Sequence, residues 1–292
     1  MARRQAAWAL ALAVLVCGGC GPRTAGGGTT ARRSVVYSMA DGQALSLDVY
    51  PVAGSGLHPA CLLIHGGGWS AGSPASERGL GQTLSRQGVV CFAVAYRLAP
   101  RHKYPTQVQD CARAARWVRA HAGEYSVDAD RLGAWGASAG GHLALLLGTM
   151  APGDYQADDD PNRALSGKAR CVVDFYGPAD LRGSSCPPAA AMYLTRFLGE
   201  PPGGDADVYA DASPVTHVTS DDAPVLLVHG DADRLVPLSQ SQAMQAALAA
   251  AEVENQLIVV KHASHNLRGA TGPDRAAAYD TATQWLVQHL RR

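Results

Sequence analysis

The feature of the sequence that most limits its possible folds is a series of short apolar segments that alternate with segments of helical periodicity. The apolar segments are nearly continuous rather than interleaved with polar residues, which is typical of β-strands covered on both faces. They are ACLLI (60–64), VVCFAVAY (89–96), RLGAW (131–135), CVVDFY (171–176), PVLLVH (224–229) and QLIVVK (256–261). Strands of this kind, separated by helices, predict a mostly parallel sheet with helices on both faces.

Two further segments predict a β-hairpin at the start of this sheet. SVVYSM (34–39) and ALSLDVY (44–50) flank a turn that contains Asp41 and Gly42, and Asp-Gly is a strong hairpin signal. Helices are expected at about 75–87, 106–121, 139–150, 238–252 and 274–290. Because we find no internal repeat and no second core, we expect residues 34–292 to form one α/β domain with an eight-stranded sheet.

One long connection interrupts the alternation. Residues 178–215 contain two Pro-Pro pairs, a Gly-Gly pair and several acidic residues, with one short apolar patch, MYLTRFL (192–198). Long connections in compact domains are usually functional or disordered. Because this connection follows the carboxyl end of a strand, we expect either a partial lid over a pocket or a plain surface excursion.

The first twenty residues differ in kind from the rest. Two arginines precede an apolar stretch from Ala6 to Val16, and small residues with Cys20 end it, so residues 1–20 predict a secretory signal. The stretch is shorter than the roughly 20 apolar residues that span a bilayer. Small residues before Cys20 also resemble the lipobox of bacterial lipoproteins, with residues 21–33 as a flexible tether. We expect export, followed either by lipidation of Cys20 and anchoring to a bacterial membrane (periplasmic or cell surface), or by cleavage to a soluble secreted form.

Composition and charge exclude several classes of protein. Hydrophobic residues make up 47% of the chain and charged residues 17%, which favours a folded domain over disorder. The formal net charge is zero, so we expect no nucleic acid as a partner. No spacing of cysteines resembles a zinc site, and we expect Asp158-Asp159-Asp160 to be a solvated loop. The sequence therefore predicts neither a metal nor a cofactor.

Five cysteines follow the predicted signal, namely Cys61, Cys91, Cys111, Cys171 and Cys186. An odd number leaves at least one of them unpaired even in an oxidising compartment. Cys61, Cys91 and Cys171 fall in strand-like segments, where a thiol usually behaves as a small buried hydrophobe. We therefore predict no particular set of disulfides.

The residues that indicate a chemical function are Gly136-Ala137-Ser138-Ala139-Gly140, which read G-x-S-x-G between a strand-like and a helix-like segment. A sharp strand-to-helix turn requires small neighbours around the serine, and it presents the hydroxyl above a helix N-terminus. In a chain with 32 glycines the pattern alone is weak. In this strand–turn–helix context it predicts Ser138 as a nucleophile.

A second motif strengthens this prediction. His65-Gly66-Gly67-Gly68-Trp69 directly follows the strand-like segment 60–64. Consecutive glycines leave backbone N–H groups unshielded, which suits an oxyanion hole opposite a nucleophile. We expect His65 to brace this loop, and Trp69 either to line an acyl pocket or to pack beside the loop.

A serine nucleophile needs a general base and an orienting carboxylate, which in this type of fold follow later strands in the order acid, then histidine. Asp231 and Asp233 follow the segment 224–229, and His262 and His265 follow the segment 256–261. We favour Asp233, because Asp231 is nearer the strand end and suited to stabilising the turn. We favour His265, because it lies deeper in its loop.

With these motifs in place, the chain resembles the α/β-hydrolase superfamily, in particular the esterases of the hormone-sensitive-lipase type and the related bacterial feruloyl-esterase-like (BD-FAE-like) group. The matching stretches are HGGGW (65–69), YRLAP (96–100), RLGAWGASAGGHLA (131–144), DFYGPADL (174–181) and HGDADRLVP (229–237). Together they cover most of the predicted domain, and their combination is highly specific.

The resemblance implies an α/β-hydrolase fold and a serine carboxylesterase. It implies Ser138 as nucleophile, Asp233 as acid and His265 as base, with an oxyanion hole formed by the N–H groups of Gly67, Gly68 and Ala139. It also implies short-chain or carbohydrate-linked acyl esters, such as acetyl or feruloyl esters, as substrates. The alternatives are an arylformamidase, amidase or exopeptidase using the same triad, and a non-catalytic, hydrolase-like binding lipoprotein.

Overall fold

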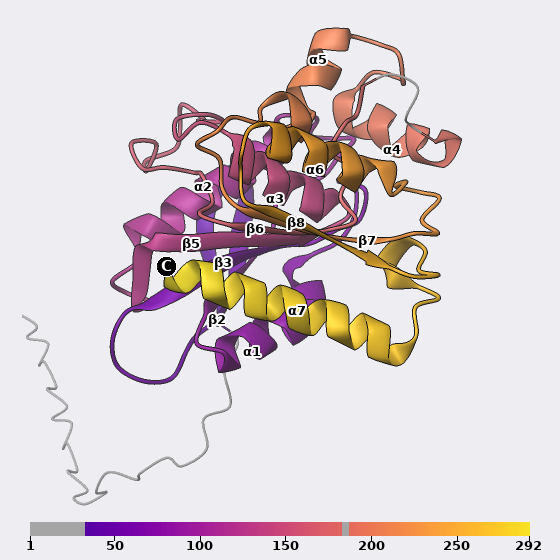
Figure 1. The fold of residues 1–292 in the computed structure, drawn as a ribbon. Coiled ribbons are helices and arrows are strands. Elements are labelled where there is room, and N and C mark those ends of the chain that lie inside the picture. Colours follow the sequence, from indigo (N-terminus) through magenta and orange to yellow (C-terminus); the bar gives the residue numbers. More distant parts are fainter. Residues whose placement is uncertain (1–32, 183–186) are drawn as a thin grey trace, which may run out of the picture.

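One mixed sheet organises the chain, and the computed structural model describes residues 33–182 and 187–292 of it (Figure 1). The eight strands of the described residues lie in the order β1-β2-β4-β3-β5-β6-β7-β8. They are β1 Arg33–Ala40, β2 Gln43–Tyr50, β3 His58–Ile64, β4 Val90–Val94, β5 Val127–Ala137, β6 Val172–Phe175, β7 Val225–Gly230 and β8 Asn255–Val260. The β1–β2 and β2–β4 pairs are antiparallel and the other pairs are parallel, so the predicted mostly parallel sheet with an N-terminal hairpin is confirmed.

Helices cover both faces of the sheet, as the apolar strands required. On one face lie α2 (Thr106–Ala120), α3 (Ala139–Thr149) and α6 (Ser239–Ala250), and on the other lie α1 (Arg78–Arg86) and α7 (Gly272–Arg291) (Figure 1). Successive strand side chains join opposite cores: in β3, Leu62 and Ile64 pack on the α3 side, whereas Leu63 packs on the α7 side. All three are at most 1% exposed, and full burial of such a side chain contributes about 1.5–3 kcal/mol.

The long connection contains more regular structure than the sequence analysis anticipated. Helix α4 (Pro188–Leu198) and helix α5 (Ala206–Asp211) lie within residues 178–215, and the 3-10 turn η3 (Pro214–Thr216) begins at its end. The predicted apolar patch is the second half of α4. A signal for α4 was present, because proline at the first helical position and glycine directly after the helix mark its two ends. Gly199 follows α4 with φ 86°, a conformation that favours glycine.

Several sequence predictions fall outside the described residues. The secretory signal 1–20, Cys20 and all but the last residue of the tether 21–33 precede the first strand, and Cys186 lies in the undescribed segment 183–186. Export and lipidation therefore stay predictions. Within residues 33–182 and 187–292, no helix is both long and apolar enough to cross a membrane.

The described cysteines are Cys61, Cys91, Cys111 and Cys171, and all four are buried free thiols. Burial raises the pKa of Cys171 to about 12, which keeps this sulfur in the unreactive thiol form. These thiols therefore act as small core side chains.

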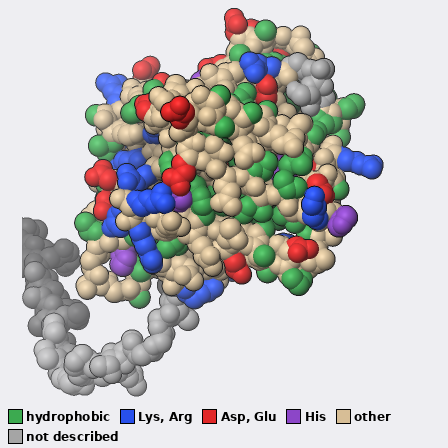
Figure 2. Space-filling view, in the orientation of Figure 1, with side chains coloured by type: hydrophobic (Ala, Val, Ile, Leu, Met, Phe, Trp, Pro, Cys, Tyr) green, Lys and Arg blue, Asp and Glu red, His purple; other side chains and the backbone are tan. Residues whose placement is uncertain are grey.

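The acidic run 158–160 is held by arginines of α2. Asp159 forms an ion pair with Arg113, and Asp160 lies 3.4 Å from the guanidinium of Arg116, which is fully buried. Asp158 and Asp159 are exposed, as expected for a solvated loop, whereas Asp160 is buried beside Arg116. On the face drawn in Figure 2, acidic and basic side chains lie close to one another, in keeping with the formal net charge of zero.

Close packing at the strand–turn–helix junction determines which residues it can contain. An added Cβ at Gly140, in the first turn of α3, would lie 2.0 Å from the carbonyl oxygen of Ile64 and 2.7 Å from that of His65. Both atoms belong to the backbone of the neighbouring strand end and cannot rotate away. The backbone contact between β3 and α3 therefore requires glycine here.

We expect Gly140→Ala to destabilise the protein by about 2–3 kcal/mol, because the methyl group overlaps fixed backbone atoms. Gly79→Ala is a matched control, since Gly79 is also helical and an added Cβ there meets no atom within 4 Å. This control should be neutral or more stable by up to about 1 kcal/mol. Urea unfolding followed by circular dichroism measures both. Equal stabilities of the two variants would contradict the packing argument.

Candidate active site

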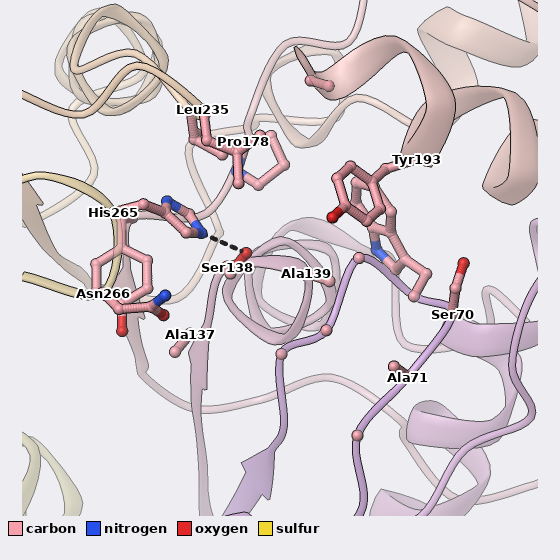
Figure 3. A pocket seen from close by; sticks show the side chains of 18 of the residues that line it. Ser70, Ala71, Ala137, Ser138, Ala139, Pro178, Tyr193, Leu235, His265 and Asn266 are labelled. Carbon is pink, nitrogen blue, oxygen red and sulfur yellow. Dashed lines mark hydrogen bonds between the residues drawn. The ribbon is translucent and has the colours of Figure 1, made fainter.

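Three of the predicted residues meet beyond the carboxyl ends of the parallel strands β5, β7 and β8. Nε2 of His265 lies 2.9 Å from Oγ of Ser138, and Nδ1 of His265 lies 2.7 Å from Oδ2 of Asp233. Ser138 follows β5, Asp233 follows β7, and His265 begins the turn η4 (His265–Leu267) after β8. Figure 3 shows the hydroxyl of Ser138 pointing toward the imidazole. Residues up to 127 positions apart in sequence thus form one chain of hydrogen bonds.

The turn presents Ser138 in a strained backbone conformation. Its φ is 56° and its ψ is −122°, a combination that non-glycine residues rarely adopt. The backbone on both sides is held, because the N–H of Ser138 donates to the carbonyl of Phe175 and the N–H of His142 donates to the carbonyl of Ser138. Ser138 is also the N-cap of α3, so its hydroxyl lies at the positive end of the helix dipole.

The surroundings of Asp233 keep its carboxylate charged and oriented. Oδ1 accepts hydrogen bonds from the N–H groups of Leu235 and Val236, at 2.9 and 3.0 Å. Burial acts to raise the pKa of this carboxyl, but hydrogen bonds from His229 and His265 outweigh it and hold the pKa well below its usual range. A carboxylate only accepts hydrogen bonds, so the Nδ1 of His265 carries the proton, and its Nε2 is left to accept from the serine hydroxyl.

The competing candidates lie elsewhere. The carboxylate of Asp231 is 3.8 Å from the amine of Lys261, whose side chain is 74% exposed. His262 is exposed, and within the described residues it has no hydrogen bond to Ser138 or to Asp233. The geometry therefore places Asp233 and His265, rather than Asp231 and His262, beside the serine.

The glycine loop lies against the serine turn. Gly67 and Gly68 have φ angles of 118° and 59°, and an added Cβ at Gly67 would lie 2.2 Å from the carbonyl oxygen of Ala71. Among the described residues, the N–H groups of Gly67 and Gly68 donate to no backbone acceptor. The N–H of Ala139 is in the first turn of α3, where helical N–H groups lack intrahelical partners. All three residues line the same cavity as Ser138.

Trp69 lines the cavity and packs beside the glycine loop, and its role in an acyl pocket stays a prediction. Its indole is stacked on Phe197 of α4 at 4.2 Å between ring centroids, and its Nε1 donates to Nδ1 of His142 at 3.3 Å. The other nitrogen of His142 donates to the carbonyl of Ala212 at 2.7 Å. Burial lowers the pKa of His142 to about 4. This neutral histidine thus joins the glycine loop to the segment between α5 and η3.

His65 braces the same loop, as expected. Its Nδ1 donates to the carbonyl of Gly66 at 2.8 Å, and its ring is stacked on Tyr96 at 4.3 Å. The hydroxyl of Tyr96 in turn donates to the carbonyl of His65 at 2.9 Å. Burial lowers the pKa of this histidine, so it is a neutral support and lies away from the serine.

A cavity of about 820 Å³ opens at Ser138 and has two chemically different walls. The first, which we name the α4 wall, is mostly apolar but also holds Asp180, Arg196 and Gln240; its apolar residues are Pro178, Leu181, Pro187, Ala190, Tyr193, Leu194, Leu235, Val236 and Pro237. The second, which we name the α7 wall, is aromatic and polar: Ser76, Glu77, Leu80, Trp135, Tyr176, Asn266 and Tyr279. In Figure 3, Pro178 and Leu235 lie above His265 and Asn266 lies below it. Part of the connection 178–215 therefore lines the cavity.

Comparison with known proteins identifies the family. Residues 47–248, which include the glycine loop, Ser138 and Asp233, match the BD-FAE family. The chain belongs to the BD-FAE family. Its fold is the α/β-hydrolase fold, as the sequence predicted.

Several proteins are similar to this BD-FAE chain. The "Probable carboxylic ester hydrolase LipM" of Mycobacterium tuberculosis is 33% identical over 64% of this chain and 44% of its own length. The "Esterase LipC" of the same organism is 34% identical, over 72% of this chain and 53% of its own length. The chain thus spans about half the length of these curated relatives.

A solved structure matches over nearly its whole length. The thermophilic esterase Est2 of the Planctomycetes species Thermogutta terrifontis superimposes with a TM-score of 0.74 and 29% identity, over 89% of this chain and 91% of that chain. Its propionate-bound form is also similar, with 28% identity and a TM-score of 0.74.

Two buried residues of the BD-FAE site were missed by the sequence analysis. His229, near the end of β7, lies next to Asp233. Its Nε2 is 3.6 Å from Oδ2 of Asp233 and donates to the carbonyl of Val236 at 2.8 Å. Its Nδ1 accepts from the hydroxyl of Ser241 at 2.7 Å. The sequence feature that pointed to His229 was its position four residues before Asp233. Their proximity, however, depends on the turn after β7.

The second missed residue is Asp174 of β6, which is fully buried under the first turn of α3. Its Oδ1 accepts from the N–H of Gly177 at 2.9 Å, whereas its Oδ2 has no hydrogen-bond partner among the described residues. An added Cβ at Gly141 would lie 2.0 Å from Oδ1, so the carboxyl packs directly on the helix that follows Ser138. Burial raises the pKa of Asp174 from 3.8 to about 7, and interactions with His229 and Gly177 offset only part of the rise.

This carboxyl makes the stability of the protein depend on pH. Its pKa is higher in the folded state, so between about pH 4 and 7 the folded protein retains a proton that the unfolded chain releases. We expect the free energy of unfolding of the wild type, minus that of Asp174→Asn, to fall as pH rises through this range and to level off above it. The slope should approach about 1.4 kcal/mol per pH unit.

Urea unfolding of both proteins at a series of pH values measures this difference. His142 has the opposite sign, because its pKa is lowered to about 4 and its contribution is lost as pH falls. It is present in both proteins and cancels in the difference. A difference that stays constant, or rises with pH, would contradict the assignment of a protonated Asp174.

Proposed function

We propose that this chain is a serine carboxylic ester hydrolase that cleaves short-chain or carbohydrate-linked acyl esters through Ser138, His265 and Asp233. The observation that carries the proposal is the chain of hydrogen bonds at 2.9 and 2.7 Å from Ser138 through His265 to Asp233, located where a cavity opens. The matched relatives LipM and LipC and the esterase Est2 are all named as esterases or ester hydrolases, which supports the same reaction. The propionate-bound form of Est2 favours a small acyl group.

In the proposed reaction, Oγ of Ser138 attacks the ester carbonyl carbon while its proton passes to Nε2 of His265. The carbonyl oxygen becomes an oxyanion, which accepts hydrogen bonds from the N–H groups of Gly67, Gly68 and Ala139. Each preorganised donor of this kind is worth roughly 10²–10³ in rate. Asp233 stabilises the imidazolium that forms, because its carboxylate is already oriented and charged.

Collapse of the tetrahedral intermediate breaks the bond to the alcohol, whose oxygen takes the proton from Nε2 of His265. The acyl group remains bound to Oγ of Ser138. Water then enters, gives a proton to His265 and attacks the acyl carbon, and the returned proton releases Ser138 and the free acid. Besides the ester and one water, the proposed cycle uses side chains and backbone groups of the described residues.

Amides are the principal alternative substrates, because the same triad hydrolyses them in an arylformamidase, amidase or exopeptidase. A panel of p-nitrophenyl acyl esters, acetylated xylan, methyl ferulate, N-formylkynurenine and aminoacyl anilides separates these activities. We expect turnover of the esters to exceed that of the amides. A kcat/KM that is higher for N-formylkynurenine or an anilide than for the esters would indicate an amidase instead.

Ser138→Ala should lower kcat for p-nitrophenyl acetate by at least about 10³-fold, because the nucleophile is removed. The fold should be retained, since alanine is smaller than serine. Circular dichroism and labelling with a fluorophosphonate probe check both points: the wild type should become labelled and the variant should not. Wild-type activity in the variant would disprove the role of Ser138, and a folded wild type that cannot be labelled would favour a non-catalytic binding protein.

Asp233→Asn should lower kcat by about 10²–10⁴-fold, because an amide cannot hold His265 in the required tautomer. Asp231→Asn is the matched control, and we expect it to change kcat by less than about threefold, since Asp231 faces Lys261 instead. Steady-state kinetics with p-nitrophenyl acetate compares the two. A larger effect of Asp231→Asn would reassign the acid.

A further inference from the structure

The α7 wall of the cavity contains a carboxylate without a cationic partner. Glu77, in the 3-10 turn η1 (Pro74–Glu77), lines the cavity and is partly buried. Its Oε1 accepts a hydrogen bond from the hydroxyl of Ser76 at 2.9 Å. Within the described residues no lysine, arginine or histidine forms an ion pair with it. This carboxylate therefore has unused capacity to accept hydrogen bonds and to bind positive charge.

Basic residues are scarce around this wall. Among the described residues that line the cavity, Arg196 is the only lysine or arginine, and it belongs to α4 on the opposite side. Arg275 of α7 lies near Tyr279, but it does not line the cavity, and its guanidinium is directed to the carbonyl of Ala270 at 3.5 Å. Burial raises the pKa of Glu77, as expected where no cation compensates a partly desolvated carboxylate.

Aromatic residues line the same wall of the cavity as this carboxylate. Trp135, Tyr176 and Tyr279 line the same wall, and the hydroxyls of the two tyrosines interact with each other. Tyr279 stacks on Phe175 with 4.6 Å between centroids and is 36% exposed, whereas Trp135 and Tyr176 are at most 4% exposed. Glu77 is near enough to both tyrosines to raise their pKa values. A carboxylate combined with aromatic faces is a common arrangement for binding an organic cation.

The wall also lies on the leaving-group side of the reaction. The ring of Tyr176 contacts that of His265 edge-on, at 5.0 Å between centroids, and Asn266 directly follows His265. Since His265 protonates the departing alcohol in the proposed reaction, that alcohol must lie next to its imidazole. The oxyanion donors lie on the glycine-loop side. The α7 wall is therefore in a position to contact the alcohol half of an ester.

From these contacts we propose that the α7 wall is a subsite for a positively charged alcohol group, in which Glu77 pairs with an ammonium held beside Tyr279, the exposed ring of this wall. This inference rests on the proposed esterase function, and it specifies the substrate class as esters of amino alcohols. The neutral acyl group then faces the mostly apolar α4 wall.

The test compares acetylcholine with its neutral isostere, 3,3-dimethylbutyl acetate, in which carbon replaces the charged nitrogen. We expect the wild type to favour acetylcholine by at least about 10-fold in kcat/KM, and Glu77→Gln to lose most of this preference, since tenfold corresponds to about 1.4 kcal/mol. Asp180→Asn is the matched control. Asp180 also lines the cavity, but it pairs with Arg182 at 2.9 Å, so this variant should keep the preference.

A binding measurement makes the result independent of catalysis. Calorimetry on Ser138→Ala should show choline binding at least about 10-fold more tightly than 3,3-dimethylbutanol, and the double variant with Glu77→Gln should lose the difference. If the folded wild type fails to hydrolyse p-nitrophenyl acetate, the proposed function is wrong. The choline measurement then still tests whether the α7 wall binds a cation.

Four results would overturn the subsite. They are equal rates for the charged and neutral esters in an active wild type, a preference that survives Glu77→Gln, an equal loss in Asp180→Asn, and the absence of selective choline binding. Glycerol monoacetate, a neutral ester with free hydroxyl groups, supplies a fifth test. If its kcat/KM exceeds that of acetylcholine and depends on Glu77, the carboxylate binds hydroxyl groups rather than a cation.

Discussion

The left-handed backbone of Ser138 is the constraint on which the rest of the site depends. With φ at 56°, the chain reverses between β5 and α3 so tightly that a backbone carbonyl of β3 fills the space beside Gly140. Strain of this kind costs about 1–3 kcal/mol, and the hydrogen bond from Ser138 N–H to the neighbouring strand β6 helps to hold it. The same tight turn lets the glycine loop pack against Ser138. The oxyanion donors and the nucleophile therefore depend on one packing arrangement.

The histidines around the cavity divide into supports and one reactive group. His65, His142 and His229 are buried, and each directs a ring nitrogen to a backbone carbonyl. That pairing satisfies a neutral imidazole and removes it from proton transfer. His265 differs because neither of its ring nitrogens is directed to a backbone carbonyl: one bonds the carboxylate of Asp233 and the other the hydroxyl of Ser138. An imidazolium formed there is stabilised by Asp233, so His265 is the histidine placed to exchange a proton with Ser138.

Much of this arrangement could be predicted from the sequence, because its signals were local. Continuous apolar segments indicated strands covered on both faces, and the structure has them within a few residues of the expected bounds. The order of Ser138, Asp233 and His265 along the chain identified residues that the fold then brings together. Asp174 and Glu77 were not predicted, because their importance depends on what surrounds them. Nothing in DFYGPADL reveals that one carboxyl oxygen of Asp174 will lack a partner, and nothing near Glu77 reveals which ring of α7 will line the same wall.

From the sequence, residues 178–215 were expected to form one long connection. In the structure, part of this connection lines the cavity, whereas other elements hold the proposed catalytic residues. The elements that hold the triad are strand ends and the turns after them, whereas α4 packs on the glycine loop, with Phe197 stacked on Trp69 and Tyr193 beside Gly68. Replacing or reshaping α4 would therefore change which molecules fit beside Ser138 while leaving the hydrogen-bonded residues in position. In evolutionary terms, the selectivity of the cavity and the integrity of its reactive group can vary separately, which allows one scaffold to acquire new substrates by altering a single segment.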